Sequence, residues 1–227
     1  MNKAPVIAID GPSGSGKGSV ARLVAEELGF ALLDSGALYR VLGIAVLRHG
    51  VDLEDHAAVA ELARTLDVEF GKSGEDSVAL EGEDVTLAIR TDAGSDMASR
   101  VGAIPAARTA LLERQLAFRQ PPGLVADGRD MGTVVFPDAE VKIFLTAAVE
   151  ERAKRRYKQL IGKGIGAILP DLLRDLKERD ERDSLRAISP LKPAEDATVL
   201  DTTDLDLAAV VARVLELVTA QLPTLDT

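Results

Sequence analysis

The residues with the clearest chemistry are the glycines, hydroxyls and lysine of residues 11–19, which read GPSGSGKGS. They follow an apolar run at residues 6–9 and lead into a helical pattern that begins at Lys17. In the order strand, glycine loop and helix, successive backbone N–H groups turn toward phosphate oxygens, and the helix adds its positive N-terminal end. Lys17 adds a full charge for the outer phosphates, so the segment predicts a nucleoside triphosphate site. The site comprises Gly11, Pro12, Ser13, Gly14, Ser15, Gly16, Lys17, Gly18 and Ser19.

One position departs from the general phosphate-loop pattern, which places a serine or threonine directly after the lysine to ligate magnesium. Here Gly18 fills that position, and the hydroxyl comes one residue later, at Ser19. The variant is untypical of GTPases and motor ATPases and typical of small kinases that phosphorylate nucleotides. A chance glycine-rich turn after a strand is the alternative, and the lysine and the following helix argue against it.

Composition excludes several classes of function. The chain has no cysteine, which removes disulfides, thiolate catalysis and zinc–cysteine sites and fits a reducing cytosol. No segment has the pattern of a secretory signal, and no apolar stretch is long enough to cross a bilayer. The formal net charge of −10 argues against a nucleic-acid polymer as partner. We therefore expect a cytoplasmic protein that binds no membrane and, since no large apolar stripe is evident, a monomer.

The alternation of apolar runs with helical patterns predicts the fold class. Five short runs indicate buried strands, which gives an α/β fold with a doubly wound, five-stranded parallel sheet. Four of the runs are followed by an aspartate, at the edge where such sheets bind ligands. The strands are expected at residues 6–9, 31–33, 124–126, 141–145 and 198–200, the helices at 17–28, 37–47, 57–66, 106–118, 149–161, 172–185 and 207–222, and the aspartates are Asp10, Asp34, Asp127 and Asp201.

Two segments interrupt this alternation. Residues 67–90 contain three short alternating runs separated by turns, which predict a small antiparallel sheet inserted between the second and third core strands. The glycine-rich residues 162–166, between two arginine-rich helices, predict a flexible hinge or lid. The expected division of the one domain is core at 1–35, insert at 36–105, core at 106–150, lid at 151–170 and core at 171–227.

Charged residues cluster in three further segments, which read DSGALYR at 34–40, ADGRDMGT at 126–133 and KERDERDSLR at 177–186. The first two lie just beyond strand ends. In the third, Arg179, Asp183 and Arg186 recur at i, i+4 and i+7, on one stripe of a helix. Residues 151–186 as a whole hold seven Arg and four Lys against seven acidic residues. Such charges can pair internally on a solvated helix face, but three clusters in one chain favour a second site for a compact anion.

Together these motifs resemble bacterial cytidylate kinases, which phosphorylate CMP and dCMP, over nearly the whole chain. The most telling segments are GPSGSGKGS, LLDSGALYR, DGRDMGTVVFPDA and KERDERD, and the inserted sheet resembles that family's enlarged monophosphate-binding region. The lid around residues 162–169 matches least, and Ser19 stands where threonine is commoner. The resemblance implies a P-loop kinase that transfers the γ-phosphoryl group of MgATP to CMP or dCMP, giving ADP and CDP or dCDP.

The resemblance also implies roles in binding the acceptor. Three arginines would grip its 5′-phosphate with planar guanidinium groups, and Arg179 and Asp183 would bind the ribose. Cytosine differs from uracil by a donor at N4 and a bare acceptor at N3, so its recognition needs both an acceptor and a donor. The phosphate arginines are Arg40, Arg129 and Arg186, the base readers are Ser99, Arg108 and Asp130, and Ser35 and Asp127 complete the set. For Ser99 alone, a helix cap is the simpler reading.

The same resemblance suggests the catalytic residues. Lys17 would bridge the β- and γ-phosphates, and Ser19 would contact magnesium, with Asp127 as a weaker contact through water. From the lid, Arg152 and Arg156 would reach over the transferring group and so join Lys17, Arg129 and Arg186. The two histidines, His49 and His56, sit in no motif and are expected at the surface.

Three other functions stay open at this level. The nearest is another nucleoside-monophosphate kinase acting on AMP, UMP or dTMP, which the phosphate loop cannot distinguish. The second is a nucleotide-dependent switch, although the guanine-reading N-K-x-D pattern of GTPases is absent. The third is a kinase that phosphorylates an alcohol, with Asp127 as the base.

Overall fold

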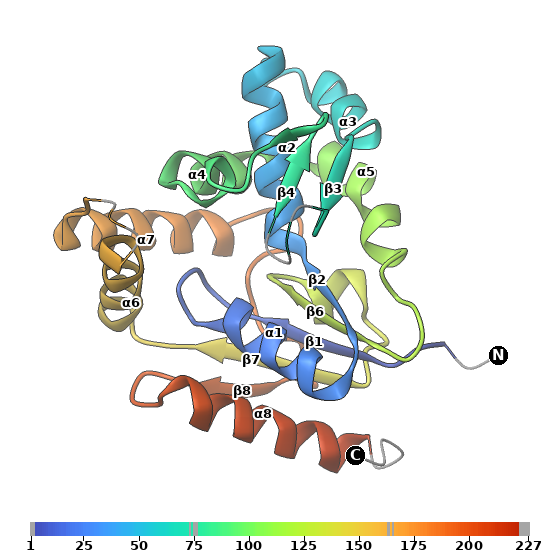
Figure 1. Cartoon of the computed structure of the whole chain (residues 1–227), viewed down its shortest axis with the longest axis vertical. Coiled ribbons are helices and arrows are strands. Elements are labelled where there is room, and N and C mark those ends of the chain that lie inside the picture. The colour runs from blue at the N-terminus through green and yellow to red at the C-terminus, as the bar shows by residue number, and fades with distance from the viewer. Residues whose placement is uncertain (1–2, 73, 75–76, 163, 165, 223–227) are drawn as a thin grey trace. The chain divides into compact units, whose positions relative to one another are not determined.

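The computed structural model describes residues 3–72, 74, 77–162, 164 and 166–222. Its chain divides into two compact units, which are described separately (Figure 1). The core unit comprises Met1–Asp34 and Leu116–Thr227, and the inserted unit comprises Ser35–Gln115. Two residues of the segment predicted to be a hinge, Lys163 and Ile165, lie outside the described residues.

A five-stranded parallel sheet forms the centre of the core unit, as predicted. Its strands run in the order β2-β6-β1-β7-β8, and each pairs in parallel with its neighbours. All residues of β1 and β6 are buried, which explains why their sequences are continuous apolar runs. The strands are β1 (Val6–Asp10), β2 (Ala31–Asp34), β6 (Leu124–Gly128), β7 (Val141–Thr146) and β8 (Thr198–Asp201).

The register of this sheet brings aspartates together at its carboxyl edge. Asp34 on β2 pairs with Asp127 on β6, which in turn pairs with Ile9 on β1. Asp10, the last residue of β1, pairs with Gly128 on one side and Phe144 on the other. The phosphate loop leaves β1 at this same edge.

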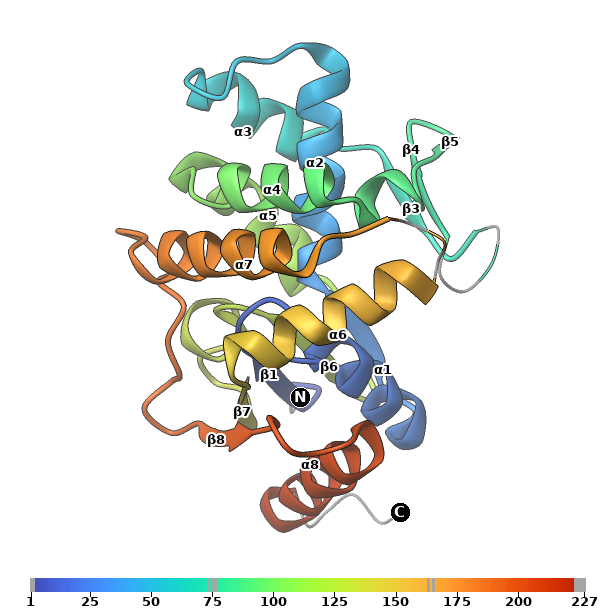
Figure 2. The ribbon, with the colours of Figure 1, turned by 90° about the vertical axis from the view of Figure 1, so that its left-hand side faces the viewer.

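Helices of the core unit pack around the sheet and close an aliphatic core. α1 (Lys17–Leu28) packs against β6 and against α8 (Leu207–Gln221), and valines of both helices are buried with those of the strands. α6 (Val149–Gly162) and α7 (Leu169–Ser184) lie side by side (Figure 2). A short π-helical turn, η2 (Met131–Val135), follows β6.

The inserted unit has its own hydrophobic core. Its three strands form the predicted antiparallel sheet in the order β3-β4-β5. Helices α2 and α4 cross closely at Gly43, where a Cβ atom would lie 2.8 Å from the Cβ of Met97. The elements are α2 (Ser35–His49), α3 (His56–Arg64), β3 (Val68–Phe70), β4 (Val78–Leu80), β5 (Glu83–Asp84), η1 (Ala88–Arg90), α4 (Asp92–Val101) and α5 (Pro105–Leu116).

Two features of this unit differ from the expected pattern. α4 was not predicted, and α5 belongs almost entirely to the inserted unit, whereas the sequence division placed residues 106–115 in the core. In the part of the chain that the structure describes, no helix has the length and apolar character needed to span a membrane.

Candidate functional site

The phosphate loop has the conformation that its glycines predict. Gly14 and Gly16 adopt positive φ angles of 77° and 90°, which L side chains rarely tolerate. Gly11 packs so closely on β7 that a Cβ atom there would lie 2.1 Å from the carbonyl oxygen of Leu145. The ammonium group of Lys17 donates a hydrogen bond to the carbonyl oxygen of Pro12 at 3.2 Å, which folds the lysine back over the loop. The loop is therefore shaped to present backbone N–H groups and one cation to a single anion.

Lys17 is surrounded by side chains of both charges. Burial, and then repulsion from Arg129 and Arg179, lower its pKa to about 7, although Asp127 and Asp34 act in the opposite direction. The arginines that resemblance assigns to the acceptor phosphate and ribose are therefore close enough to influence the phosphate-loop lysine. A polyanionic ligand would relieve this repulsion.

The glycine that follows the lysine lies close to a carboxylate. Gly18 is the second residue of α1, and a Cβ atom at that position would lie 3.1 Å from Oδ2 of Asp127. A serine or threonine side chain there would crowd the carboxylate, and the hydroxyl of this motif lies at Ser19, which is exposed one residue later. The local sequence could not show this contact, because Asp127 belongs to a different strand.

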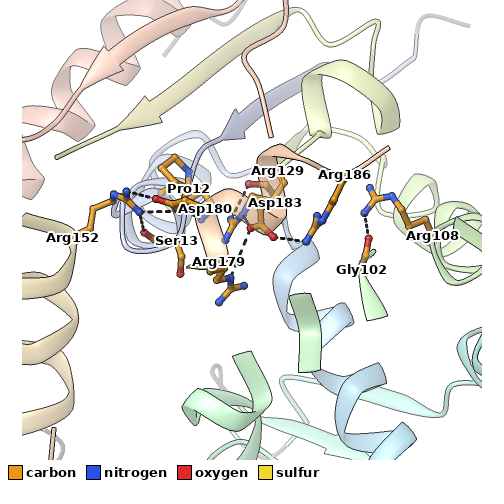
Figure 3. Close-up of polar contacts among 12 residues, drawn as sticks. Pro12, Ser13, Gly102, Arg108, Arg129, Arg152, Arg179, Asp180, Asp183 and Arg186 are labelled. Atoms are coloured by element: carbon orange, nitrogen blue, oxygen red, sulfur yellow. Dashed lines mark hydrogen bonds and ion pairs between the residues drawn. The ribbon is translucent and has the colours of Figure 1, made fainter. Parts of the chain in front are cut away.

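A buried carboxylate organises the guanidinium cluster. Asp183 on α7 is 1% exposed and accepts hydrogen bonds from Arg129 Nε at 3.1 Å and from Arg186 Nη2 (Figure 3). Arg179 Nε lies 3.8 Å from Oδ2 of the same carboxylate. Burial alone would raise the pKa of Asp183, but the charges of Arg129, Arg186 and Arg179 outweigh it and hold this pKa below its ordinary value. Three of the predicted acceptor arginines thus meet at one point of the core unit.

Arg152 on α6 is held by the phosphate loop and by α7. It is 4% exposed, and its guanidinium group donates to Ser13 O at 2.9 Å, to Ala147 O at 3.0 Å and to the carboxylate of Asp180 (Figure 3). Arg156, one turn further along, is only partly buried and donates to Gln159 at 3.1 Å. The two lid arginines therefore have different surroundings.

Arg155 was not among the predicted site residues, yet it also contacts the phosphate loop. Its guanidinium group donates to Ser15 O at 3.3 Å and to Thr202 Oγ1 at 3.0 Å. Thr202 follows β8 and is 1% exposed. The sequence signal for Arg155 was its place between Lys154 and Arg156 in an arginine-rich helix, and this does not separate one arginine from another.

Four of the predicted acceptor residues belong to the inserted unit. Ser35 and Arg40 lie on α2, Ser99 on α4 and Arg108 on α5. Ser35 and Ser99 are buried. Arg108 donates to the carbonyl oxygen of Gly102 at 3.1 Å, and its guanidinium carbon lies 5.5 Å from the centroid of the Tyr39 ring. Ser99 lies near the end of α4, whose N-cap is Thr91, so the reading of Ser99 as a helix cap is wrong.

Asp130 is buried at the start of η2, directly after Arg129. Both oxygens of another buried carboxylate, Asp10, accept hydrogen bonds from this turn: Met131 N at 2.9 Å and Gly132 N at 2.8 Å. Sequence reasoning noted Asp10 as a strand end and gave it no function. The two histidines are exposed, as expected.

The described residues contain no group of three or more histidine or acidic side chains arranged to hold a metal ion. Magnesium does not require such a cage, because it is usually bound through one or two carboxylates together with substrate phosphates and water. Asp127 Oδ2, which lies against Gly18 at the start of α1, and the exposed hydroxyl of Ser19 are hard oxygen donors of this kind. The residues present therefore fit magnesium held jointly with a triphosphate.

Comparisons with known proteins agree with this geometry. The family model described as cytidylate kinase matches residues 7–220. A cytidylate kinase from Stutzerimonas stutzeri (strain A1501) is 59% identical over 218 residues, covering 95% of each chain. Cytidylate kinases from Aeromonas salmonicida (strain A449) and Pseudomonas aeruginosa (strain UCBPP-PA14) are 57% and 58% identical over 220 residues, covering 96% and 95% of this chain and 96% of each relative. Since the similarity spans the phosphate loop, the inserted unit and the arginine cluster alike, the chain belongs to the cytidylate kinase family.

Proposed function

We propose that this protein transfers the γ-phosphoryl group of ATP to CMP or dCMP, giving ADP and CDP or dCDP. The observation that carries this proposal is the proximity of two anion-binding arrangements in the core unit. One is the phosphate loop with Lys17, and the other is the cluster of Arg129, Arg179 and Arg186 around Asp183. A protein that only bound a triphosphate would have no use for the second arrangement.

The acceptor in this reaction is a phosphate oxygen, which is already anionic near neutral pH, so no general base is required. Phosphoryl transfer depends mainly on positioning and on stabilising the charge of the transferring group. Lys17 would bind the β- and γ-phosphates, and Arg129 and Arg186 would hold the acceptor phosphate and neutralise charge on the transferring group. Their shared contact with Asp183 fixes the guanidinium planes before the acceptor binds.

We propose that residues of both units bind the acceptor nucleotide. Arg40 would join Arg129 and Arg186 on the 5′-phosphate, while Arg179 and Asp183 would bind the ribose. The base would be read by Ser99, Arg108 and Asp130, whose donors and acceptors suit the N3 and N4 positions of cytosine. Such a polar site rejects uracil because a mismatched base leaves buried groups without partners. Ser35 and Asp127 complete the proposed set.

The triphosphate would be bound by the backbone of residues 13–18, and Ser19 and Asp127 would hold magnesium. The metal, when bound, neutralises charge on the β- and γ-phosphates. Arg156 would reach the transferring group when the lid closes, and Arg152 would support the phosphate loop through its bond to Ser13 O. Closure also excludes water, which otherwise competes as the acceptor. The protein is further proposed to act as a cytoplasmic monomer on small nucleotides.

The test is a panel of acceptors offered with MgATP. We expect rapid ADP release with CMP and dCMP, and 31P NMR should show the corresponding diphosphates as products. UMP, AMP and dTMP should react far more slowly. Comparable rates with one of these would identify another nucleoside-monophosphate kinase. Hydrolysis of ATP at the same rate with and without any acceptor would indicate a nucleotide-dependent switch and refute the proposal.

A further inference from the structure

Asp10 is a buried carboxylate to which the proposed reaction assigns no role. It is the last residue of β1 and directly precedes Gly11 of the phosphate loop. Its side chain is aimed at a segment more than a hundred residues away, where Oδ1 accepts from Met131 N at 2.9 Å and Oδ2 from Gly132 N at 2.8 Å. Both oxygens are thus engaged with backbone N–H groups.

These two N–H groups belong to the turn that follows the acceptor-binding residues. Arg129 and Asp130 come directly before Met131, and Asp130 is the N-cap of η2. The first N–H groups of a helical turn have no partner within the turn, so in η2 the carboxylate of Asp10 supplies it. A shift of this turn would move the guanidinium of Arg129 and the carboxylate of Asp130 together.

We propose that Asp10 is a positioning residue, which fixes the Arg129–Asp130 segment to the end of the phosphate-loop strand and thereby sets where the acceptor lies relative to the triphosphate. The inference rests on the proposed function and deepens it. Asp10 is 5% exposed, with both oxygens bonded to the backbone, so it acts through the segment it holds and not on the substrate.

The electrostatics of Asp10 support a role other than stability. Burial, together with the negative charges of Asp130 and Asp127, raises its pKa to about 7 in spite of the two backbone hydrogen bonds, which act in the opposite direction. The side chain of Lys142 passes beside Gly132, but its ammonium group is bonded to Pro137 O and Asp196. A buried carboxylate facing two others is costly. A neutral amide would relieve this repulsion but could accept only one of the two hydrogen bonds, so losing the charge should change stability little while the turn loses one of its two contacts with Asp10.

The experiment compares Asp10→Asn with a matched control, Asp206→Asn. The side chain of Asp206 caps α8 by accepting from Ala209 N at 2.8 Å, so both substitutions replace a carboxylate that accepts from helical N–H groups. In D10N the new NH₂ group faces a backbone N–H and cannot accept from it. We expect KM for CMP to rise or kcat to fall roughly 10- to 100-fold, with KM for ATP and the melting temperature at pH 8 retained. D206N should change the melting temperature little, because asparagine caps a helix about as well as aspartate does, and it should leave the kinetics unchanged.

Two results would overturn the proposal. One is D10N with unchanged kcat and unchanged KM for CMP. The other is D10N that loses melting temperature and affinity for both substrates equally, as a purely structural residue would. If D10N does not fold, Gly132→Ala serves instead, because its methyl group would lie 3.2 Å from the Lys142 side chain and 3.5 Å from Asp10 Oδ2. It should displace the turn without changing a charge and raise KM for CMP selectively, and unchanged kinetics would refute the role of Asp10. Turnover of CMP by the unsubstituted protein tests the proposed function separately.

Discussion

Lys17 carries less charge in the free protein than an ordinary lysine, because burial and the nearby Arg129 and Arg179 lower its pKa to about 7. A bound triphosphate favours the protonated form and raises this pKa again. Above pH 7, ATP binding must therefore take up a proton, and ATP affinity should fall by up to about tenfold per pH unit as the pH rises. Below pH 7 the lysine is protonated in both states, so this contribution disappears.

Calorimetric titration in buffers of different ionisation enthalpy measures the proton uptake directly. At pH 8 we expect close to one proton per ATP for the unsubstituted protein, and none from this source for Lys17→Ala. The same variant should lose at least about 100-fold in kcat and keep its fold. An equal proton uptake in both proteins would show that another group titrates.

Asp183 is a buried counter-charge shared by three arginines, so Asp183→Asn should be strongly destabilising. Removing one partner of a buried ion pair typically lowers the free energy of unfolding by about 3–5 kcal/mol. Because the pKa of Asp183 is lowered in the folded state, its contribution is present above the unfolded value of 3.8 and is lost as the pH falls through the folded value. Urea unfolding across a pH series should show a constant difference between the two proteins at pH 5–8 that shrinks below about pH 4. A difference that grows toward acid pH would contradict this account.

At the scale of elements, α6 and α7 are joined by an ion pair between the buried Arg152 and the partly buried Asp180. Arg152 on α6 is buried and bonded to Asp180 on α7 as well as to the phosphate loop, whereas Arg156 is only partly buried. Asp180→Ala should therefore lower the free energy of unfolding by about 2 kcal/mol or more, since it leaves a buried guanidinium short of its counter-charge. Arg156→Ala should lower kcat and leave the melting temperature unchanged.

Thermal unfolding and steady-state kinetics on the two variants separate these roles. Amide hydrogen exchange would add a local readout, because D180A should lose protection along α6 and α7 before other helices. If R156A reduced stability and D180A did not, our assignment of a supporting role to Arg152 and a catalytic role to Arg156 would be wrong.

Helices and strands could be predicted from the sequence where residues within or next to the element mark its ends. The bounds of α1 were predicted correctly because Gly16 and Gly29, both with positive φ, delimit a clear helical pattern. Helix α4 was missed because its sequence, DAGSDMASRV, holds glycine, two serines and two aspartates, which are weak helix formers. Its stability comes from packing against α2, including the close approach at Gly43. Tertiary contacts of this kind are invisible in a local pattern.

The candidate site likewise contains residues that local motifs identify and contacts that they cannot. Lys17, Arg129, Arg179, Asp183 and Arg186 were found from motifs, and the structure brings them near one another in the core unit. What the sequence could not show were contacts between distant segments. Asp127 lies close against Gly18, and Asp10 holds the turn at Met131. Both contacts depend on the sheet register, which places the ends of different strands side by side. The local sequence of one segment does not reveal that register.

At the scale of the whole molecule, base selectivity is proposed to depend on both units. Arg108 lies in the inserted unit and Asp130 in the core unit. If they read the same base, Arg108→Ala and Asp130→Asn should each reduce the ratio of kcat/KM for CMP over UMP, by roughly 10-fold or more. KM for ATP should change little, because neither residue is assigned to the triphosphate.

The double variant decides whether the two units act on one ligand. Residues that bind the same nucleotide show non-additive effects, whereas independent sites add within about 0.5 kcal/mol. We therefore expect the double variant R108A/D130N to lose less selectivity than the sum of the single losses. Once the first substitution misplaces the base, the second residue no longer contacts it well, so removing that residue changes the selectivity less. Strict additivity would mean that the two residues do not share a ligand. In that case the two residues would contribute to the cytosine preference independently of each other, and the proposal that they read one base together would be wrong.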